Sequence, residues 1–338
     1  MRPLLLLLVA AALAGTTQRA GAQPEKPLEI HVIDVEGGQA TLFVSPSGES
    51  MLVDTGWAGF NGRDADRIAA VVQKAGLSRI DYLVVTHYHA DHVGGVPALS
   101  AKVPIRTFVD HGPTVEQGDQ PASLYNNYLA VRDKARHILA RPGDTLPIKG
   151  LDVRIVSAAG DVITTALPGA GQPNPLCGAY AAMDPDPTEN ARSVGMVITF
   201  GKFRMLDLGD LTWNREHDLV CPNNLLGTVD LYLTTHHGLN LSGSPQLVHA
   251  VHPRVAVMNN GARKGGIPSA WSIVKSSPGL EDLWQLHYAV DGGADHNVAE
   301  PFIANSGDAE GNEIRIVVQK SGSFEVTNGR NGHSKTYR

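Results

Sequence analysis

The sequence predicts a mixed α/β (α+β) fold of four layers (αββα), in which two mixed sheets pack face to face between outer helices. The order of elements indicates this fold: strands and a helix come first, a strand with a polar motif and further helices follow, and strands and helices then recur. In addition, polar residues able to bind a metal directly follow apolar, strand-like runs. We therefore expect a site at one edge, between the two sheets.

The first half of the chain begins with three strands and a helix. Residues 28–35, 40–44 and 50–56 are rich in β-branched and apolar residues and are separated by turn-forming residues. Residues 64–75 have apolar residues at helical spacing, and Gly76 follows as a stop signal. The elements expected next are strands at 80–85, 106–110 and 151–156 and helices at 96–101 and 122–140.

The second half of the chain predicts a second sheet with its own helices. Residues 158–190 are rich in glycine, alanine and proline, so we expect a long loop there that borders the site. The other expected elements are a hairpin at 194–200 and 203–210, helices at 213–220 and 268–276, strands at 228–235 and 254–258, and a closing hairpin at 314–318 and 323–326.

The most informative stretch is residues 86–95, which follow the apolar strand predicted at 80–85. Its candidate metal ligands are His87, His89, Asp91 and His92. Imidazole nitrogens and carboxylates are ligands that zinc, iron and manganese accept. On a strand-to-helix loop the first two histidines can bind one metal, and the aspartate and the third histidine can reach a second. The Gly94-Gly95 pair that follows allows close backbone packing beneath the ligands.

This pattern resembles the signature of the metallo-β-lactamase fold superfamily, and four further segments extend the resemblance. It implies that Asp54, in Asp54-Thr55-Gly56, supports the metal loop by hydrogen bonding, and that Asp210 bridges both metals. It also implies that His236 supplies the last ligand of the second metal with His237 beside it, although the order could be reversed. Asn190 stands where many relatives have a third histidine ligand of the first metal, and it is a candidate for contact with substrate.

The opening turn, Glu36-Gly37-Gly38-Gln39, is similar to one branch of the superfamily, the soluble domain of the ComEC competence protein and its stand-alone relatives. Ala40 stands where that branch usually has an acidic residue. The resemblance to the branch favours phosphodiester-type substrates.

Several other polar residues are candidates for contact with substrate. Residues 259–266 combine asparagine, arginine, lysine and glycine, so Asn260, Arg263 and Lys264 could bind an anion, or the loop could be a solvated turn. His111 could contact substrate or support the site, or it could be a surface turn histidine. The candidate catalytic residues are Asp91, which can pass on a proton, and His237, which can steady developing negative charge. His287 and His296 are not expected to be ligands.

The ends and the composition predict an exported protein. Residues 1–22 have a positive start, an apolar segment and the Ala20-Gly21-Ala22 cleavage pattern, so we expect a signal peptide and a mature chain from about Gln23; an uncleaved membrane anchor is the alternative. Residues 23–338 are expected to form a single domain without a membrane span, secreted or periplasmic. Cys177 and Cys221 could form one disulfide or remain two buried thiols.

The formal net charge of −6 makes a stable nucleic-acid partner unexpected and favours a small-molecule substrate. The resemblance implies an exported hydrolase in which one or two metal ions, zinc or alternatively manganese or iron, activate water against a phosphodiester or related small substrate. Lactone, ester or β-lactam hydrolysis could use the same site. An iron-dependent redox role and a non-catalytic metal-binding protein are the other interpretations.

Overall fold

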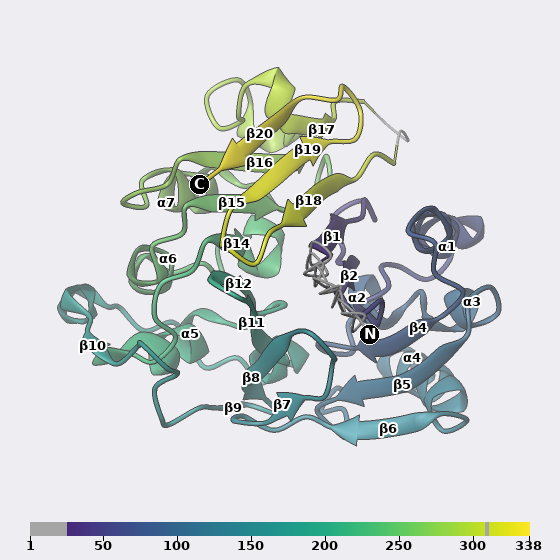
Figure 1. The fold of residues 1–338 in the computed structure, drawn as a ribbon. Coiled ribbons are helices and arrows are strands. Elements are labelled where there is room, and N and C mark those ends of the chain that lie inside the picture. The colour runs from purple at the N-terminus through teal and green to yellow at the C-terminus, as the bar shows by residue number, and fades with distance from the viewer. Residues whose placement is uncertain (1–25, 308–310) are drawn as a thin grey trace, which may run out of the picture.

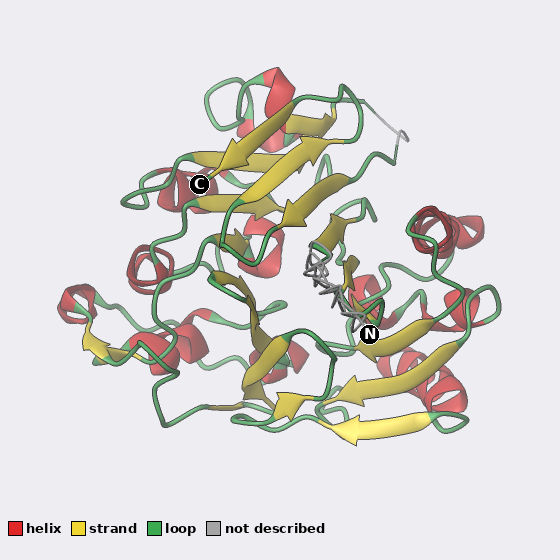
Figure 2. Ribbon diagram, in the orientation of Figure 1, coloured by secondary structure: helices red, strands yellow, loops and turns green. Residues whose placement is uncertain are grey.

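The computed structural model describes residues 26–307 and 311–338, so the expected signal peptide (1–22) and the mature start at Gln23 lie outside the described residues. The described chain forms two large sheets, each of nine strands, which lie between helices. Figure 1 labels these elements, and Figure 2 shows the helices on the outer sides and the strands between them. Among the described residues no helix has both the length and the apolar character needed to cross a membrane.

The first sheet joins the two ends of the described chain. Its order is β20-β19-β18-β1-β2-β3-β4-β5-β6, so the C-terminal strands pair with the strand that opens the fold. Its strands are β1 (Leu28–Val32), β2 (Thr41–Val44), β3 (Ser50–Val53), β4 (Ile80–Val84), β5 (Ile105–Asp110), β6 (Arg136–Leu139), β18 (Ile314–Val318), β19 (Phe324–Asn328) and β20 (Ser334–Tyr337).

The second sheet has the order β17-β16-β15-β14-β12-β11-β8-β7, with β9 paired to β8. Its strands are β7 (Thr145–Leu146), β8 (Asp152–Ala158), β9 (Asp161–Val162), β11 (Gly195–Phe200), β12 (Phe203–Asp207), β14 (Leu231–Leu233), β15 (Val255–Met258), β16 (Asp282–His287) and β17 (Ile303–Asn305). A separate short ribbon pairs β10 (Gln172–Pro173) with β13 (Asn223–Asn224).

Three apolar clusters correspond to the three interfaces between four layers. One contains residues of both sheets, such as Ile30 and Met196, and fills the space between them. A second packs the first sheet against helices, and a third does the same for the second sheet. The helices are α1 (Arg63–Lys74), α2 (Ala90–Val93), α3 (Val96–Ser100), α4 (Asp119–Arg132), α5 (Trp213–Val220), α6 (Pro245–Val251) and α7 (Pro268–Lys275). The predicted four-layer fold is confirmed.

Some predicted elements differ from the structure. The helix predicted at 122–140 is wrong in its second half, because α4 ends at Arg132 and residues 136–139 form β6, which pairs in parallel with β5. The strand predicted at 50–56 ends at Val53, because Asp54 has φ of 60°, which an extended strand does not allow. The structure also contains elements that the sequence did not predict, among them α6, β16, β17 and β20.

Candidate metal centre

Loops from both sheets meet at one edge of the fold. β3 and β4 pair in parallel, as do β12 and β14, so each pair ends at a common sheet edge. Asp54 follows β3, residues 86–92 follow β4, Asp210 follows β12, and His236 and His237 follow β14. The sequence motifs therefore converge because of the strand order, although more than 100 residues separate some of them.

Four of these side chains form one compact, buried group. Asp91, His92, Asp210 and His237 offer ligand atoms that all lie within 4.8 Å of one another. Asp91 Oδ2 is 3.3 Å from His92 Nε2 and 3.2 Å from His237 Nε2, and the two histidine nitrogens are 3.2 Å apart. Asp210 completes the group, with 3.2 Å from Oδ2 to His92 Nε2 and 3.4 Å from Oδ1 to His237 Nε2.

This group fits a divalent metal ion. Ligand atoms at about 2.0–2.2 Å from a tetrahedral zinc ion are separated by about 3.3–3.6 Å from one another. The separations of 3.2–3.4 Å given above are close to this range. Asp210 Oδ1 is buried and has no hydrogen-bond partner among the described residues. A buried carboxylate oxygen without a partner is costly, and a cation beside it removes that cost. The donor set of two imidazoles and two carboxylates suits zinc, manganese or iron.

Asp54 sets the hydrogen positions on two of the candidate ligands. Its Oδ2 lies 2.7 Å from His92 Nδ1 and accepts a hydrogen bond from Thr86 Oγ1 at 2.6 Å, and its Oδ1 accepts from Thr86 N at 2.8 Å. Because the carboxylate only accepts, His92 Nδ1 carries the hydrogen. Thr86 Oγ1 has already donated its hydrogen, so at 3.0 Å it accepts from His87 Nδ1. In the neutral form of each histidine the lone pair is therefore on Nε2, where a metal can bind it.

His87 and His89 lie beside this group and are not members of it. His87 Nε2 is 3.1 Å from His89 Nδ1 and 3.9 Å from Asp210 Oδ2. His89 Nε2 is 3.2 Å from Glu116 Oε1. The Glu116 carboxylate accepts the Nε2 hydrogen and leaves Nδ1 of His89 free on the side of His87. These two nitrogens could hold a first metal next to the Asp210 carboxylate.

Asn190 lines the same cavity as His89. The residue is only 7% exposed, and its side-chain amide makes no hydrogen bond within the described chain. The neighbouring Glu189 fixes its place, because the Glu189 carboxylate accepts from Val115 N at 2.8 Å and from Thr114 Oγ1 at 2.9 Å. The amide group is therefore free to contact a bound molecule.

His236 and His237 occupy opposite sides of the Asp210 carboxylate. His237 is the one that joins the four-residue group, whereas the sequence favoured His236 as the ligand. His236 Nε2 is 3.4 Å from Asp210 Oδ2. Both histidines have φ of 56°, a region rare for residues other than glycine, so adjacent side chains point in different directions. Hydrogen bonds from His236 N to Gly209 O at 3.0 Å and from Gly266 N to His237 O at 2.9 Å hold this turn.

Electrostatics keep the group ready to bind a cation. Burial works to raise the pKa of Asp91 and Asp210, but the surrounding histidines outweigh it and hold both pKa values well below the usual range. Burial lowers the pKa of His236 to about 4. Burial also works to lower the pKa of His92, but Asp210, Asp91 and Asp54 together raise it well above its usual value. A metal must therefore displace a proton from His92.

The tentative substrate residues have different surroundings. Lys264 contacts Asp91 Oδ2, and its ammonium lies 4.9 Å from the ring centroid of Trp57. Arg263 is exposed. Asn260 is fully buried and donates to His287 O at 2.9 Å, a contact that supports the loop. His111 is also buried, with Nε2 2.8 Å from Glu189 Oε2, so it is not a surface turn histidine.

Gln39 is a site residue whose role the sequence did not reveal. Its Nε2 donates to Asp207 Oδ1 at 3.1 Å and Oδ2 at 2.9 Å, its N donates to Asp91 O at 3.1 Å, and its O accepts from Gly56 N at 3.0 Å. One residue thus joins three loops of the site. At Gly38 an added Cβ would lie 2.4 Å from Asp91 O, so only glycine allows this approach. The sequence feature that marked the position of Gln39 was the turn predicted at residues 36–39.

A second group of possible metal ligands, Asp34, Glu36 and His287, links the two sheets. Arg67 already supplies positive charge there, with Nη1 2.9 Å from Asp34 Oδ2 and 3.3 Å from Glu36 Oε1. Asp34 Oδ1 lies 2.7 Å from His287 Nε2. This group is an ion-pair network between the sheets, and His287 has no place in the candidate metal centre.

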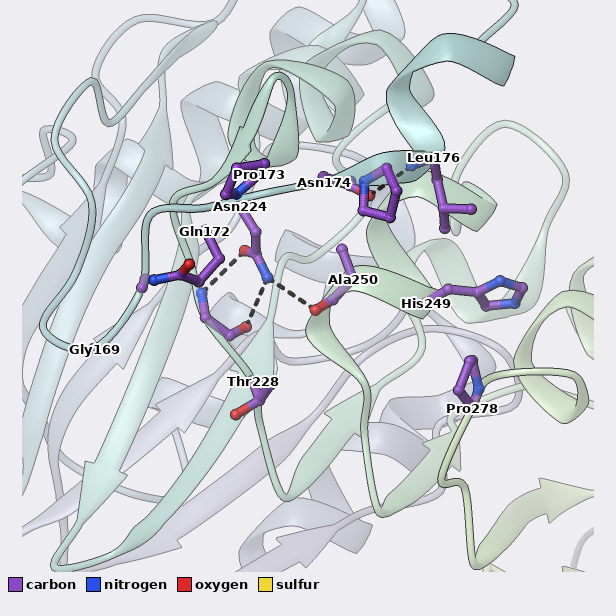
Figure 3. Close-up of a pocket in the computed structure, with 13 residues that line it drawn as sticks. Gly169, Gln172, Pro173, Asn174, Leu176, Asn224, Thr228, His249, Ala250 and Pro278 are labelled. Atoms are coloured by element: carbon purple, nitrogen blue, oxygen red, sulfur yellow. Dashed lines mark hydrogen bonds between the residues drawn. The ribbon is translucent and has the colours of Figure 1, made fainter.

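A cavity of about 410 Å³ lies away from the metal loops (Figure 3). Its polar floor is formed by Asn174 and Asn224, whose side chains are engaged by the protein backbone: Asn224 Nδ2 donates to Ala250 O at 2.8 Å, and Asn174 Oδ1 accepts from Leu176 N at 3.1 Å. The nearby Cys177 and Cys221 form a disulfide, which decides between the two alternatives that the sequence left open. The cavity contains none of the candidate metal ligands.

Comparison with known proteins supports the resemblance. Residues 33–175 match the model described as "Metallo-beta-lactamase superfamily". The similarity to a metallo-beta-lactamase superfamily domain is therefore shown for this part of the chain. The matched residues include Asp54 and the motif at 87–92, while Asp210 and His237 lie beyond them. The predicted resemblance is confirmed, and the candidate centre occupies the edge that both the motif and the strand order indicated.

Curated relatives share parts of this chain. "Recombination protein 2" of Haemophilus influenzae is 26% identical over 242 residues, which are 71% of this chain and 25% of that protein. A "Hydroxyacylglutathione hydrolase" of Stenotrophomonas maltophilia is 31% identical over 112 residues, or 31% of this chain and 37% of that enzyme. The chain therefore spans 25% to 37% of the length of these relatives. Among solved structures, the metallo-beta-lactamase fold protein YhfI of Bacillus subtilis is 13% identical, covering 77% of this chain and 96% of that one, with a TM-score of 0.46.

Proposed function

We propose that this chain is a metal-dependent hydrolase that cleaves a phosphodiester or related ester bond in a small substrate. The observation that carries the proposal is the buried group of Asp91, His92, Asp210 and His237, whose spacing fits a divalent ion. Bound divalent metals supply a nucleophile from water at neutral pH and polarise the oxygen of the bond under attack. Zinc is the first choice for the metal, with manganese or iron as alternatives.

The residues of this chain have distinct parts in the proposed reaction. Asp54 and Thr86 fix the hydrogen on Nδ1 of His92 and His87, so that Nε2 is the nitrogen that would bind a metal once it is unprotonated. Asp91 stays ionised and is placed to receive and pass on a proton. Lys264, beside Asp91 at the end of a partly exposed loop, brings positive charge to the place where negative charge develops on the substrate.

The preference for a phosphodiester has two supports. One is the similarity to Recombination protein 2, together with the opening turn at residues 36–39 that resembles the ComEC-like branch. The other is the pair of cations Arg263 and Lys264 at the edge of the site. The net charge of −6 favours a small substrate over a long nucleic acid.

Hydrolysis of a carboxylic ester or thioester is the second candidate. The 31% identity with a hydroxyacylglutathione hydrolase favours it, although the match covers only 31% of this chain. Asp184 and Asp186, close to His89, also make one side of the site negative, which disfavours a doubly charged phosphate there.

The test is parallel hydrolysis of bis(4-nitrophenyl) phosphate and 4-nitrophenyl acetate by the zinc- or manganese-loaded protein, with Asp91→Ala beside it. The matched control is Asp66→Ala, because Asp66 is an exposed carboxylate paired with Lys102. We expect turnover of the phosphodiester that EDTA and Asp91→Ala abolish and Asp66→Ala preserves. Turnover of the acetate alone would select the second candidate, and turnover unaffected by Asp91→Ala would refute the proposed site.

Export from the cytoplasm is part of the same proposal. Its supports are the signal-peptide pattern of residues 1–22 and the Cys177–Cys221 disulfide, a bond typical of oxidising compartments. Expression of the full chain should yield a protein whose N-terminus, read by Edman degradation or mass spectrometry, is near Gln23 and which is recovered outside the cytoplasm. An intact Met1 in the cytoplasmic fraction would contradict export.

A further inference from the structure

We propose that a cavity beside His89 binds an uncharged aryl or alkyl group of the substrate, next to the bond that is cleaved. The inference rests on the proposed hydrolase function and adds the class of substituent that the substrate carries. The cavity has a volume of about 260 Å³, which is below the range of about 300–1,000 Å³ usual for a whole drug-sized ligand. It therefore suits one part of a substrate, about the size of one substituted ring.

The position of the cavity connects it with the candidate metal centre. His89, from the metal motif, forms part of its lining, and so does Thr212, two residues after Asp210. Asn190 lines it as well, with a side-chain amide that is nearly buried and not engaged by other described residues. A buried amide left free in this way points to a bound molecule as its partner. A substrate with its reacting bond near His87 and His89 can extend one substituent into this space.

The walls of the cavity are mainly apolar. Met183, Trp213 and Leu241 contribute large hydrophobic side chains, and Leu241 is 47% exposed in the structure as it stands. When an apolar group covers this exposed leucine and partly exposed tryptophan, apolar surface is removed from water, which makes binding of the group favourable.

The charge of the lining excludes an anionic occupant. Asp184 and Asp186 are its two charged residues, apart from the histidine, and no lysine or arginine is among the lining residues that the structure describes. A second phosphate or a carboxylate on the substituent would meet these carboxylates without a counter-ion. The substituent must therefore be neutral, while the scissile phosphate itself lies on the side of Lys264.

The wall is fixed in place before any ligand binds. Asn214 accepts from Tyr180 Oη at 2.6 Å and donates to Met183 O at 2.8 Å, and Trp213 Nε1 donates to Ala181 O at 3.2 Å. The Cys177–Cys221 disulfide joins the segment just before Tyr180 to the end of α5. The long loop predicted at 158–190 therefore does reach the edge of the site, as part of a preformed wall.

A binding experiment tests the cavity without requiring turnover. 4-Nitrobenzyl alcohol, an uncharged nitroaryl quencher of tryptophan fluorescence, is titrated into the metal-free full-length protein. We expect saturable quenching that Trp213→Phe removes and Leu241→Ala weakens severalfold. Leu139→Ala is the matched control, because Leu139 is also an exposed leucine (41%) but lies in β6. The anion 4-nitrobenzoate should bind about tenfold more weakly than the alcohol.

A kinetic experiment tests whether the cavity serves the reaction. For 4-nitrophenyl phosphodiesters that differ only in the second ester group, we expect kcat/KM to be about tenfold or more higher for phenyl than for methyl, because the ring is buried. Leu241→Ala should reduce the phenyl advantage through KM, whereas the control Leu139→Ala should leave the phenyl advantage as in the wild type.

The outcomes separate this inference from the proposed function. Saturable, Leu241-dependent binding without hydrolysis of any ester would leave the cavity assignment in place and refute the hydrolase. Hydrolysis with no phenyl preference, or quenching equally affected by Leu241→Ala and Leu139→Ala, would overturn the cavity assignment and leave the hydrolase standing.

Discussion

Asp54→Asn is the substitution that separates hydrogen-bond control of the ligands from simple packing. Asparagine has the same shape and tolerates the left-handed backbone that Asp54 adopts, with φ of 60°. The carboxylate accepts from both Thr86 and His92, whereas an amide offers one acceptor and one donor group. If the amide nitrogen faces His92 Nδ1, the histidine hydrogen moves to Nε2 and blocks the lone pair that a metal needs.

The expected magnitude follows from the hydrogen bonds that this substitution removes. Removing the partner that orients a metal-binding histidine typically lowers metal affinity about 10- to 100-fold, which is about 1.4–2.7 kcal/mol. The Asp54 bond to His92 is 2.7 Å long and charge-assisted, so metal-free stability should also fall by about 1–3 kcal/mol. The rearrangement reaches His87 through Thr86 Oγ1, so both candidate metal positions should weaken together.

The assay is a zinc titration of metal-free protein in competition with a chromophoric chelator, accompanied by urea unfolding of each variant. Asp81→Asn is the control, because Asp81 is also a buried carboxylate of the first sheet but accepts from Ser50 N and contacts no metal ligand. Two results would refute the argument that Asp54 fixes the tautomers of His92 and His87. One is a zinc affinity of Asp54→Asn equal to that of the wild type, and the other is a loss of zinc affinity in Asp81→Asn as large as that in Asp54→Asn.

Three further predictions concern other contacts. Gln39→Leu should destabilise the protein by about 1–3 kcal/mol in urea unfolding, because the Asp207 carboxylate loses the hydrogen bond that Gln39 Nε2 donates. The loss should be larger at pH 8 than at pH 5, because burial raises the pKa of Asp207 to about 6 and only its ionised form is left without this donor. Asn190→His should raise affinity for a first metal about tenfold, as counted by metal analysis after dialysis. Burial works to raise the pKa of Glu313, but His31 and Lys74 lower it from 4.5 to about 2. The ionised Glu313 therefore stabilises the folded protein by about 3 kcal/mol above pH 4.5, and this stabilisation is lost as the pH falls to 2. Glu313→Gln should remove it at pH 6.

Each of these predictions has a result that contradicts it. The prediction for Gln39 is contradicted if Gln39→Leu loses no more stability than Gln73→Leu, because Gln73 is an exposed glutamine of α1. The prediction for Asn190 is contradicted if Asn190→His binds no more metal than Asn331→His, a substitution at an exposed asparagine. For Glu313 it is a wild-type stability that stays constant from pH 6 to pH 3.

The layered fold could be predicted because apolar periodicity and turn residues mark most strands and helices locally. The helix predicted at 122–140 shows the limit, because residues 136–139 continue the helical spacing but pair with β5 as an edge strand. That pairing depends on the free edge of β5, which only the assembled sheet provides. Strands such as β20 likewise form by pairing with β19 and carry a weak local signal.

The site could be predicted where its ligands follow one another in the sequence. His87, His89, Asp91 and His92 lie in one loop, and their spacing alone indicates a metal. Contacts between distant segments could not be read in this way: Gln39 and Asp207 are 168 residues apart, and Glu116 reaches His89 across 27 residues. The choice between His236 and His237 depends on two left-handed backbone conformations that no sequence pattern encodes.

The most direct test of the central claim, a metal held by Asp91, His92, Asp210 and His237, is zinc binding by His237→Ala measured beside His236→Ala. The account predicts that His237→Ala lowers zinc affinity at least tenfold and that His236→Ala, outside the four-residue group, has the smaller effect. Zinc affinity in His237→Ala equal to that of the wild type would contradict it.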